Sequence, residues 1–311
     1  LQIDKYAYKE KAQEVLGQTD HLTIIEGMVD GFNLIEQDGK RAIAGVWVTQ
    51  DGNRVYYEAD AVVVTAGTFL NGVLHVGLSQ SAGGRVGEAA VTSLSATLQE
   101  ALGVTLGRLK TGTPPRLRTG SIDYSVLEEQ EEQRLEYLFT FDAPAGGVRD
   151  VMPCFIAHTN ASTHEIIAKN IGLSAMYSGN IKGVGPRYCP SIEDKIGRYP
   201  DRTSHHVFVE PEGKDIDEVY PAGLSTSLPY DVQVAYIRSI KGFENAEIVK
   251  PGYAVEYDFV QPTALTHTLE TKRVSGLFFA GQINGTTGYE EAAGQGILAG
   301  INAALKAQGK A

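Results

Sequence analysis

Cysteine is scarce in this sequence: only Cys154 and Cys189 occur among its 311 residues. They lie too far apart in the sequence for a CxxC pair, and two cysteines are too few for a disulfide framework. The first residues show no charged-then-apolar leader, and no apolar run is long enough to cross a bilayer. These absences predict a soluble protein that works in a reducing cytoplasm.

Two phosphate-binding fingerprints are also missing. The sequence contains no GxGxxG motif and no Gly-Lys-Ser/Thr of a Walker loop. The histidines show no metal-ligand spacing either, although His158, His164, His205 and His206 lie near one another in the sequence. We therefore predict no metal site.

Positive charge is in short supply as well. The formal net charge is −11, which argues against broad, non-specific nucleic-acid binding because phosphate contacts need Lys and Arg. One stretch departs from this balance, since residues 101–122 carry no acid but contain Arg108, Lys110, Arg116 and Arg118. This stretch is either a local RNA contact or a solvated loop, and the sequence leaves both possibilities open.

The length and the 42% of hydrophobic residues predict a globular protein with a large core and two structural units.

The first third of the sequence predicts mainly strands. We expect an amphipathic helix over residues 6–16, a strand over 22–26, and a three-stranded meander over 31–36, 42–49 and 54–58. Asp-Gly pairs between the three runs indicate tight hairpin turns. A fully apolar strand over 61–64 then leads into the small residues 65–68, which would let backbone approach a flat ligand.

The middle of the sequence is more mixed. It predicts a helix over residues 93–102, a basic turn over 107–118 and a solvent-exposed acidic helix over 128–136. We interpret residues 152–236 as part of a second domain that is inserted into the first.

The end of the sequence forms a distinct unit. A buried strand over residues 276–280, a glycine-rich turn over 281–288 and a helix over 289–305 follow in the order used by nucleotide-binding α/β folds. Three glycines inside that helix, Gly294, Gly296 and Gly300, each cost about 1 kcal/mol relative to Ala, so packing or a ligand must offset them. We expect packing at Gly300, and a ligand facing Gly281, Gly285 and Gly288.

Cys189 precedes another predicted helix. Pro190 suits a first helical position, and Glu193 and Asp194 would then lie in the first turn. Unpaired N–H groups at a helix start lower a thiol pKa while the two acids oppose this, so we expect a poised thiol. The alternative is a small buried cysteine before an ordinary helix.

Four long segments closely resemble one family. They are GRLKTGTPPR (107–116), GVGPRYCPSIEDK (183–195), STSLPY (225–230) and FFAGQINGTTGYEEAAGQG (278–296), with support from PGYAVEYDF (251–259). The sequence resembles the MnmG family, also called GidA, over nearly its whole length. The resemblance implies an α/β fold, a glutathione-reductase-like FAD domain of Rossmann type with an inserted mixed α+β domain. The implied boundaries are residues 1–108 and 251–311 for the FAD domain and 109–250 for the inserted NADH or substrate domain.

The resemblance also implies an activity. Family members modify the wobble uridine of tRNA at C5, adding an aminomethyl or carboxymethylaminomethyl group with FAD, NADH and methylenetetrahydrofolate. They work as homodimers with the partner GTPase MnmE. The chemistry needs a nucleophile that adds to the pyrimidine ring, and Cys189 matches one of the family's two functional cysteines.

The resemblance carries further roles over to this sequence. Gln282 matches a family FAD contact, Val29 matches a position whose backbone meets the adenine, and the α-helix after Gly288 would direct its dipole at the flavin. Arg187 and Lys195 are candidate phosphate or RNA contacts within the NAD-binding segment. The cofactor-binding candidates are Val29, Thr65, Gly67, Thr68, Gly281, Gln282, Gly285, Gly288, Glu290, Gly185, Pro186, Arg187, Tyr188 and Lys195, and the RNA candidates are Arg108, Lys110 and Arg116.

Some family features are missing. The N-terminal FAD fingerprint, the first functional cysteine and the C-terminal helical region would lie outside residues 1–311, so we expect a fragment that retains little FAD. Cys154 does not replace the missing cysteine, and we expect a buried structural thiol there. The alternatives are a folate- and FAD-dependent tRNA uridine C5-methyltransferase and an inactive fragment that only binds a cofactor or partner.

Overall fold

The structure is a computed structural model that describes residues 3–37, 39–130, 152–185 and 190–310. The chain forms two compact units, each assembled from three stretches that are separate in the sequence. Unit 1 comprises Leu1–Leu22, Thr113–Ile171 and Ser191–Gly252. Unit 2 comprises Thr23–Gly112, Gly172–Pro190 and Tyr253–Ala311. Whether these units correspond to a cofactor domain and an inserted domain stays a prediction, because contacts define them and not what they bind.

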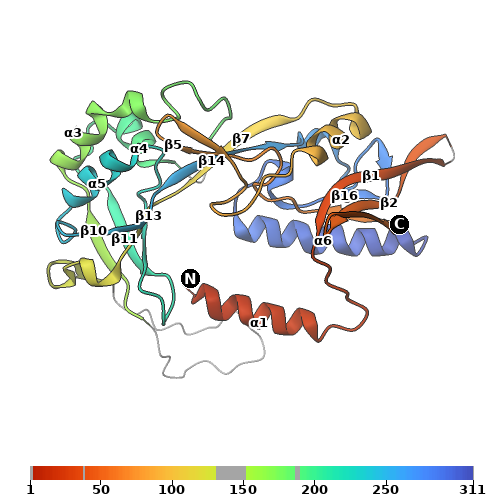
Figure 1. Ribbon diagram of the computed structural model, residues 1–311, viewed down its shortest axis with the longest axis horizontal. Helices are drawn as coiled ribbons and strands as arrows, with labels where there is room; N and C mark the ends of the chain where they lie inside the picture. Colours follow the sequence, from red (N-terminus) through yellow and green to blue (C-terminus); the bar gives the residue numbers. More distant parts are fainter. Residues whose placement is uncertain (1–2, 38, 131–151, 186–189, 311) are drawn as a thin grey trace. The chain divides into compact units, whose positions relative to one another are not determined.

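Unit 1 is built on a six-stranded sheet. Its elements are α1 (Lys5–Gly17), β8 (Arg116–Leu117), β9 (Glu128–Glu129), β10 (Phe155–His158), α3 (Ala161–Lys169), α4 (Ile192–Arg198), β11 (His206–Pro211), β12 (Val219–Ala222), α5 (Tyr230–Arg238) and β13 (Ile248–Lys250), with short 3-10 turns at Thr119–Ser121 and Tyr124–Val126. The strand order is β13-β8-β12-β11-β10-β9, and every neighbouring pair is antiparallel. Figure 1 labels β10, β11 and β13 of this sheet.

The core of unit 1 lies between this sheet and its helices. Inward residues of β11 and α5 are completely buried, including Val207, Val209 and Tyr236. Helix α3 begins with a capping box, in which the Asn160 side chain accepts a hydrogen bond from the Thr163 N–H at 3.0 Å. This satisfies one of the amide groups that a helix start leaves unpaired, and so fixes where α3 begins.

Unit 2 contains several small sheets. Its elements are β1 (Met28–Gln37), β2 (Lys40–Gln50), β3 (Asn53–Glu58), β4 (Val62–Val64), β5 (Val73–Val76), β6 (Ser79–Ala82), α2 (Ser93–Leu102), β7 (Gly107–Thr113), β14 (Tyr253–Phe259), β15 (Val274–Ser275), β16 (Leu277–Phe279) and α6 (Tyr289–Ala307), with 3-10 turns at Pro262–Ala264 and Gly281–Asn284. A further 3-10 turn, Ile171–Leu173, begins at the last residue of a unit 1 stretch. One sheet joins β1, β2, β3 and β15, a second has the order β6-β5-β14-β7, and β4 pairs with β16.

The predicted meander is confirmed. Strands β1, β2 and β3 pair antiparallel, with Gln37 opposite Lys40 and Gln50 opposite Asn53. Each connection is therefore two residues long, and the second has positive φ at both positions, 47° at Asp51 and 78° at Gly52. This backbone matches the right-handed twist of the paired strands, which is why Asp-Gly predicts the turn.

The closing unit of the sequence also forms as predicted. Strand β16 pairs in parallel with β4, and α6 packs beside both, burying Ala299 and Ala303 against the strands (Figure 1). The predicted helix over residues 93–102 corresponds to α2. Its side chains Leu94, Leu98 and Leu102 join the core that β4 and β16 share.

Several expectations for local structure are wrong. Residues 22–26 are not a strand but an irregular segment with exposed Ile24 and Ile25. The predicted basic turn over residues 107–118 consists of strands β7 and β8, whose partner strands lie far along the chain. Glu128 and Glu129, expected in a helix, form strand β9, and residues 131–136 of that prediction lie outside the described residues.

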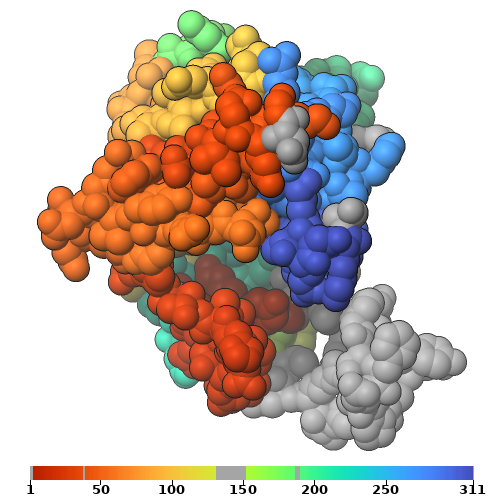
Figure 2. All heavy atoms as spheres, turned by 90° about the vertical axis from the view of Figure 1, so that its right-hand side faces the viewer, coloured from red at the N-terminus to blue at the C-terminus, as the bar shows by residue number. Residues whose placement is uncertain are grey.

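Two helices are less buried than the sequence suggested. Helix α1 has no buried residue, although the sequence predicted an amphipathic helix there, whose apolar face would be buried. Packing does not explain the helical glycines of α6, because a Cβ built at Gly294, Gly296 or Gly300 would meet no atom of the described residues within 4 Å apart from the backbone of the helix itself. The same helix exposes Ile297 and Ile301, and its end lies at the molecular surface, in dark blue in Figure 2.

Candidate functional site

Two small-residue turns of unit 2 lie at the same sheet edge. Because β4 and β16 are parallel, their carboxyl ends point the same way, and the Ala280 N–H donates to the Val64 carbonyl at 3.1 Å. The turn over residues 65–68 follows β4, and the glycine-rich turn over 281–288 follows β16. Ligands of α/β proteins bind at the carboxyl ends of parallel strands. The two turns predicted to lie beside a cofactor are therefore brought together.

Gln295, on the second turn of α6, orders the glycine-rich turn. Its side-chain oxygen accepts hydrogen bonds from the Gly281 N–H at 3.0 Å and from the Asn284 side chain at 2.8 Å. Its side-chain nitrogen donates to the Thr286 hydroxyl at 3.2 Å, and that hydroxyl donates to the Gly281 carbonyl at 3.0 Å. The sequence did not predict a role for Gln295, because neither its residue type nor its spacing indicates that its side chain faces the glycine-rich turn before the helix.

The same turn holds two buried oxygens that have no hydrogen-bond partner within the described chain. They are Oε1 of Gln282 and Oδ1 of Asn284, whose side chain is 5% exposed. The Asn284 amide nitrogen is already used, since it donates to the Phe279 carbonyl and to Gln295. A buried acceptor without a partner costs about 1–3 kcal/mol. The turn is therefore suited to a ligand that offers N–H or O–H donors.

Backbone conformation keeps this turn glycine-rich. Gly281 and Gly285 both have φ of 82°, the left-handed region that glycine adopts without strain. Gly288 is the N-cap of α6, and a Cβ there would collide with the Glu291 carboxylate. Glu290 and Glu291 occupy the first turn of α6, so the helix start already has negative charge of its own.

The turn over residues 65–68, after β4, is fixed by a hydrogen bond to another loop of unit 2 and not by α6. Gly67 has φ of 55°, and the Thr68 hydroxyl donates to the Gly84 carbonyl at 2.6 Å. Thr65, immediately after β4, is exposed. Val29 lies half-buried in β1 against the core that β4 and β16 share, next to a shift of strand register between Val29 and Gly31.

The predicted RNA-contacting residues have protein partners or are buried. The Arg108 guanidinium lies 3.2 Å from the Glu256 carboxylate and 2.8 Å from that of Asp258. Lys110 is 2% exposed. In unit 1, Arg116 forms an ion pair with Glu212 and lies 4.3 Å from the ring centroid of Tyr220.

The predicted Cys189 helix starts later than expected. Ser191 is the N-cap of α4, and Ile192 is its first residue, so Pro190 is not the first helical residue. Cys189 itself lies outside the described residues, as do Pro186, Arg187 and Tyr188, whereas Gly185 is described and exposed. The helix start therefore gives no support to a lowered thiol pKa.

The acids of α4 have structural partners. Asp194 lies in the first turn, and its carboxylate accepts from the Ser191 N–H at 3.2 Å. Glu193 is completely buried and accepts at 3.0 Å from both the Thr226 hydroxyl and the Ser227 N–H. Two of the family-like segments, 183–195 and 225–230, thus meet through one carboxylate.

Other groups of unit 1 have structural surroundings too. Lys195 donates to the Gly223 carbonyl at 3.0 Å. Burial raises the pKa of the Tyr236 hydroxyl well above its ordinary value, and the nearby Glu193 raises it further. Burial also raises the pKa of the half-buried Cys154 thiol, with a smaller contribution from Glu210, so this thiol is a weak nucleophile at neutral pH.

The histidines of unit 1 form two ring pairs. His158 and His206 lie 4.9 Å apart by ring centroids, and His164 and His205 lie 5.3 Å apart. Burial lowers the pKa of both His164 and His205. Across the described residues, no three His, Cys, Asp or Glu side chains are grouped to hold a metal ion. Within the same ranges, none of the helices has the length and apolar character needed to span a bilayer.

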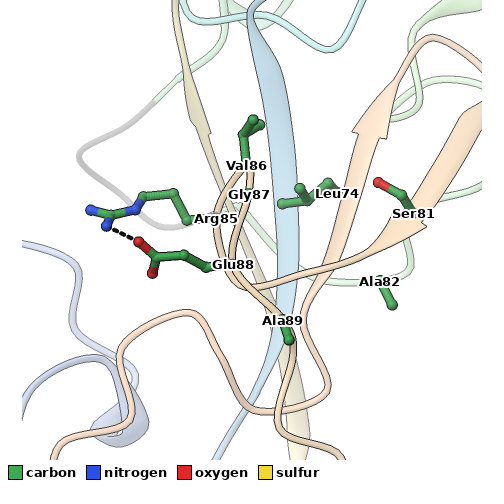
Figure 3. Close-up of a pocket in the computed structure, with 8 residues that line it drawn as sticks. All are labelled: Leu74, Ser81, Ala82, Arg85, Val86, Gly87, Glu88 and Ala89. Carbon is green, nitrogen blue, oxygen red and sulfur yellow. Dashed lines mark hydrogen bonds and ion pairs between the residues drawn. The ribbon is translucent and has the colours of Figure 1, made fainter. Parts of the chain in front are cut away.

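Two hollows lie outside these clusters. One hollow, of about 360 Å³, lies beside the loop after β6 (Figure 3). Its only charged lining residues, Arg85 and Glu88, form an ion pair with each other. The other, of about 600 Å³ in unit 1, is largely apolar, and Tyr124 and Thr119 are among the residues that line it. The hydroxyls of these two residues are buried and have no partner in the described chain. Burial, aided by Asp217, raises the pKa of Tyr124 to about 12. Sequence reasoning predicted neither hollow.

Unit 2 is thus an α/β unit with a candidate ligand site at the carboxyl edge of its parallel strand pair. A family model described as "Glucose inhibited division protein A" (GidA) matches residues 1–311. The form I crystal structure of Aquifex aeolicus GidA superposes with a TM-score of 0.89 and 48% sequence identity, covering 99% of this chain and 51% of that one. The form II structure gives a TM-score of 0.88 and 45% identity, covering 100% of this chain and 49% of that one. The chain belongs to the GidA family and has its α/β fold, and it spans about half the length of these solved GidA chains.

Proposed function

We propose that this chain is the cofactor-binding part of a FAD-dependent enzyme that modifies the wobble uridine of tRNA at C5. The observation that carries the proposal is a pair of buried oxygens, of Gln282 and Asn284, that have no hydrogen-bond partner among the described residues. They lie at the carboxyl edge of β4 and β16, in a chain that belongs to the GidA family. The glutathione-reductase-like arrangement, with cofactor-domain boundaries 1–108 and 251–311 around an inserted domain at 109–250, is part of this proposal.

The residues at this edge fit a flavin nucleotide. Gln282 and Asn284 would accept hydrogen bonds from ring N–H or ribityl O–H groups, and Gly281, Gly285 and Gly288 would let backbone approach the cofactor. Thr65, Gly67 and Thr68 would border it from the neighbouring strand, with the Val29 backbone toward the adenine and Glu290 at the helix start. Bound FAD would supply redox chemistry, with NADH as the reductant, and Gly185, Pro186, Arg187, Tyr188 and Lys195 would form the NADH-binding segment.

Cys189 is proposed as the nucleophile. Addition of its thiolate to C6 of the uracil ring would make C5 electron-rich enough to attack the methylene carbon of methylenetetrahydrofolate. Loss of the C5 proton and elimination of the thiolate from C6 would restore the C5–C6 double bond and free Cys189, and replacement of the folate nitrogen on the methylene carbon by ammonium or glycine would release tetrahydrofolate. Cys154 is not proposed for this role, because burial raises the pKa of its thiol above the ordinary value and so lowers its thiolate fraction.

The remaining assignments concern the partners of the whole protein. The substrate tRNA, the GTPase MnmE, a homodimeric state and a cytoplasmic location are proposals from family resemblance. RNA contact by Arg108 or Arg116 would require each to leave the carboxylates that it now pairs with, and contact by Lys110 would require its exposure. These contacts favour structural roles for the three residues.

A non-catalytic role is the second candidate. The chain spans about half the length of the solved GidA chains. In this second candidate role it binds a cofactor or a partner and does not itself carry out the reaction. Flavin absorbance of the purified 311-residue chain separates a competent cofactor domain from an inert fragment. Stoichiometric tight flavin would identify a competent cofactor domain, and we expect weak retention.

The decisive experiment uses the protein in its native full-length form. Cys189→Ser and the control Cys154→Ser are each incubated with the partner GTPase, methylenetetrahydrofolate, FAD, NADH and unmodified tRNA, and the wobble nucleoside is analysed by mass spectrometry. We expect Cys189→Ser to lose the product while retaining flavin, and Cys154→Ser to form it. Product at the parent level from Cys189→Ser would refute the role of Cys189.

A further inference from the structure

Three side chains, His158, His206 and Phe208, form a row of rings on one face of the unit 1 sheet. His158 on β10 lies opposite His206 on β11, with ring centroids 4.9 Å apart. Phe208 lies 6.3 Å from His206 by ring centroids and shares its face, because alternate residues of a strand point the same way. Both histidines are exposed, and Phe208 is 37% exposed. Val207 and Val209, between and beside them, are completely buried, so this ring row faces away from the core.

A threonine ties the two strands together beside the ring row. The Thr159 N–H donates to the His205 carbonyl at 3.0 Å, and the His205 N–H donates to the Thr159 hydroxyl at 2.8 Å. The same hydroxyl lies 2.7 Å from Nε2 of His164. The backbone next to His158 and His206 is therefore already ordered, which lowers the entropy cost of binding a ligand there.

Positive charge gathers at the same end of the sheet. Burial lowers the pKa of His205, and the basic groups around it lower this pKa further. They are His164, Lys195, Arg202 and His206. The acids of this edge lie further along, where Glu210 is half-buried and Glu212 pairs with Arg116. An anion is therefore attracted to the histidine end of the sheet, although the net charge of the chain is −11.

The two permanent cations come from helix α4 and the turn after it. The Lys195 ammonium donates to the Gly223 carbonyl at 3.0 Å, and a Cβ at Gly223 would lie 2.9 Å from the His206 carbonyl. Lys195 therefore lies beside the start of β11. Arg202 is exposed, and its N–H donates at 3.0 Å to the carbonyl of Tyr199, whose side chain is 57% exposed.

We propose that the ring row, with Lys195 and Arg202 beside it, is a contact surface for unpaired bases of the substrate RNA. Aromatic and imidazole rings on an open sheet face stack on unpaired bases, and neighbouring cations attract the phosphates. A duplex offers no such bases, because they are already stacked within it. The inference rests on the proposed function for the identity of the RNA, and it places the contact away from Arg108 and Arg116, which pair with carboxylates.

The test separates the ring from the charge, with a matched control for each. Phe208→Leu removes a ring but keeps an apolar side chain on β11, and Arg202→Gln removes a permanent charge. The controls are Tyr230→Leu, at a 50% exposed position on α5, and Lys169→Gln, at an exposed lysine that pairs with Glu165 on α3. All four are made in the full-length protein, and thermal unfolding checks that each is folded.

Fluorescence anisotropy measures the binding of two labelled RNA probes over a range of salt concentrations. One probe is the unmodified anticodon stem-loop of a substrate tRNA, and the other is a continuous duplex with the same stem sequence. We expect Phe208→Leu to weaken stem-loop binding by about fivefold or more at every salt concentration and to leave duplex binding unchanged. Arg202→Gln should reduce the slope of log K against log salt by about 0.7, the value for one phosphate contact on a single strand. Both controls should bind as the parent does.

Parent-level stem-loop binding by Phe208→Leu, or an equal loss in Tyr230→Leu, would overturn the stacking role. An equal loss of duplex binding in Phe208→Leu would overturn the preference for unpaired bases. An unchanged salt slope in Arg202→Gln would overturn the role of its charge. If Phe208→Leu does not fold, His206→Asn makes the same comparison at an exposed position of the ring row.

A failure of the proposed function would look different. If the parent modifies tRNA while the ring-row variants bind it normally, this surface is wrong and the proposed function stands. If Cys189→Ser still forms the modified nucleoside while Phe208→Leu loses stem-loop affinity, the nucleophile assignment is wrong and the surface stands. With both correct, Phe208→Leu should raise KM for tRNA with little change in kcat, because the ring contributes to binding and not to the reaction.

Discussion

The side-chain oxygen of Gln295 accepts a hydrogen bond from the Gly281 N–H at 3.0 Å, which ties the first residue of the glycine-rich turn to helix α6. The turn thus depends on a residue fourteen positions further along the sequence. Its shape is set by that helix together with the positive φ of Gly281 and Gly285.

Replacing Gln295 should therefore loosen the proposed cofactor site. Gln295→Ala removes three hydrogen bonds of the turn, and we expect a loss of about 1–3 kcal/mol in the free energy of unfolding together with weaker flavin retention. Asn302→Ala is the control, since Asn302 lies on the same helix and donates an exposed hydrogen bond to the Thr268 carbonyl. Denaturant titration and flavin fluorescence of the full-length protein measure both effects, and unchanged flavin retention would contradict the expectation.

The buried carboxylate of Glu193 should be essential to unit 1. Glu193→Ala leaves the Thr226 hydroxyl and the Ser227 N–H without their acceptor, and we expect destabilisation of about 3 kcal/mol. Glu165→Ala, which removes an exposed pair with Lys169 on α3, should have little effect. Thermal unfolding of the two variants tests this prediction. A similar small decrease in the unfolding temperature of both would count against the role of Glu193.

Substitution by alanine should change the free energy of unfolding in opposite directions at two glycines of unit 2, Gly300 and Gly285. Gly300→Ala places a methyl group in open space within α6, so we expect the 311-residue chain to gain up to about 1 kcal/mol. Gly285→Ala should destabilise it, because φ is 82° there and the new Cβ would lie 3.3 Å from the Phe259 ring. Denaturant midpoints of the two variants give the comparison. A loss of stability in Gly300→Ala would mean that another surface covers this position.

His75 should make stability depend on pH below about 6.5. Burial holds its folded pKa below the ordinary value of 6.5, so the unfolded chain takes up the proton first as the pH falls. The contribution of His75 is therefore complete above the unfolded pKa and is lost as the pH falls toward the folded one. His75→Gln should flatten this decline in denaturant titrations between about pH 5 and 7, whereas His267→Gln, at an exposed position, should follow the parent curve. A decline of unchanged slope in His75→Gln would refute the assignment.

Local chemistry was enough to predict some elements. The Asp-Gly turns of the meander, helix α2 and the strand–turn–helix at the end of the chain follow from turn residues and hydrophobic period alone. The four family-like segments are also continuous stretches of sequence, so the family could be predicted from the sequence. In each of these cases the deciding residues are neighbours along the chain.

The remaining features depended on partners far away in the sequence. Residues 107–113 look like a basic turn, yet they form β7 because β14 offers a paired edge nearly 150 residues later. The sequence predicted Arg108 as an RNA contact and Glu193 as an acid in the first turn of a helix, and it gave Gln295 no role. Only the folded chain gives these three side chains the carboxylates, hydroxyls and amides that they bind. Turn residues and hydrophobic periodicity were therefore sufficient to predict the turns and the well-patterned helices, and the long motifs were sufficient to predict the family. Which polar groups are buried and paired is established only on folding, because burial and hydrogen bonding join residues that local propensity cannot connect.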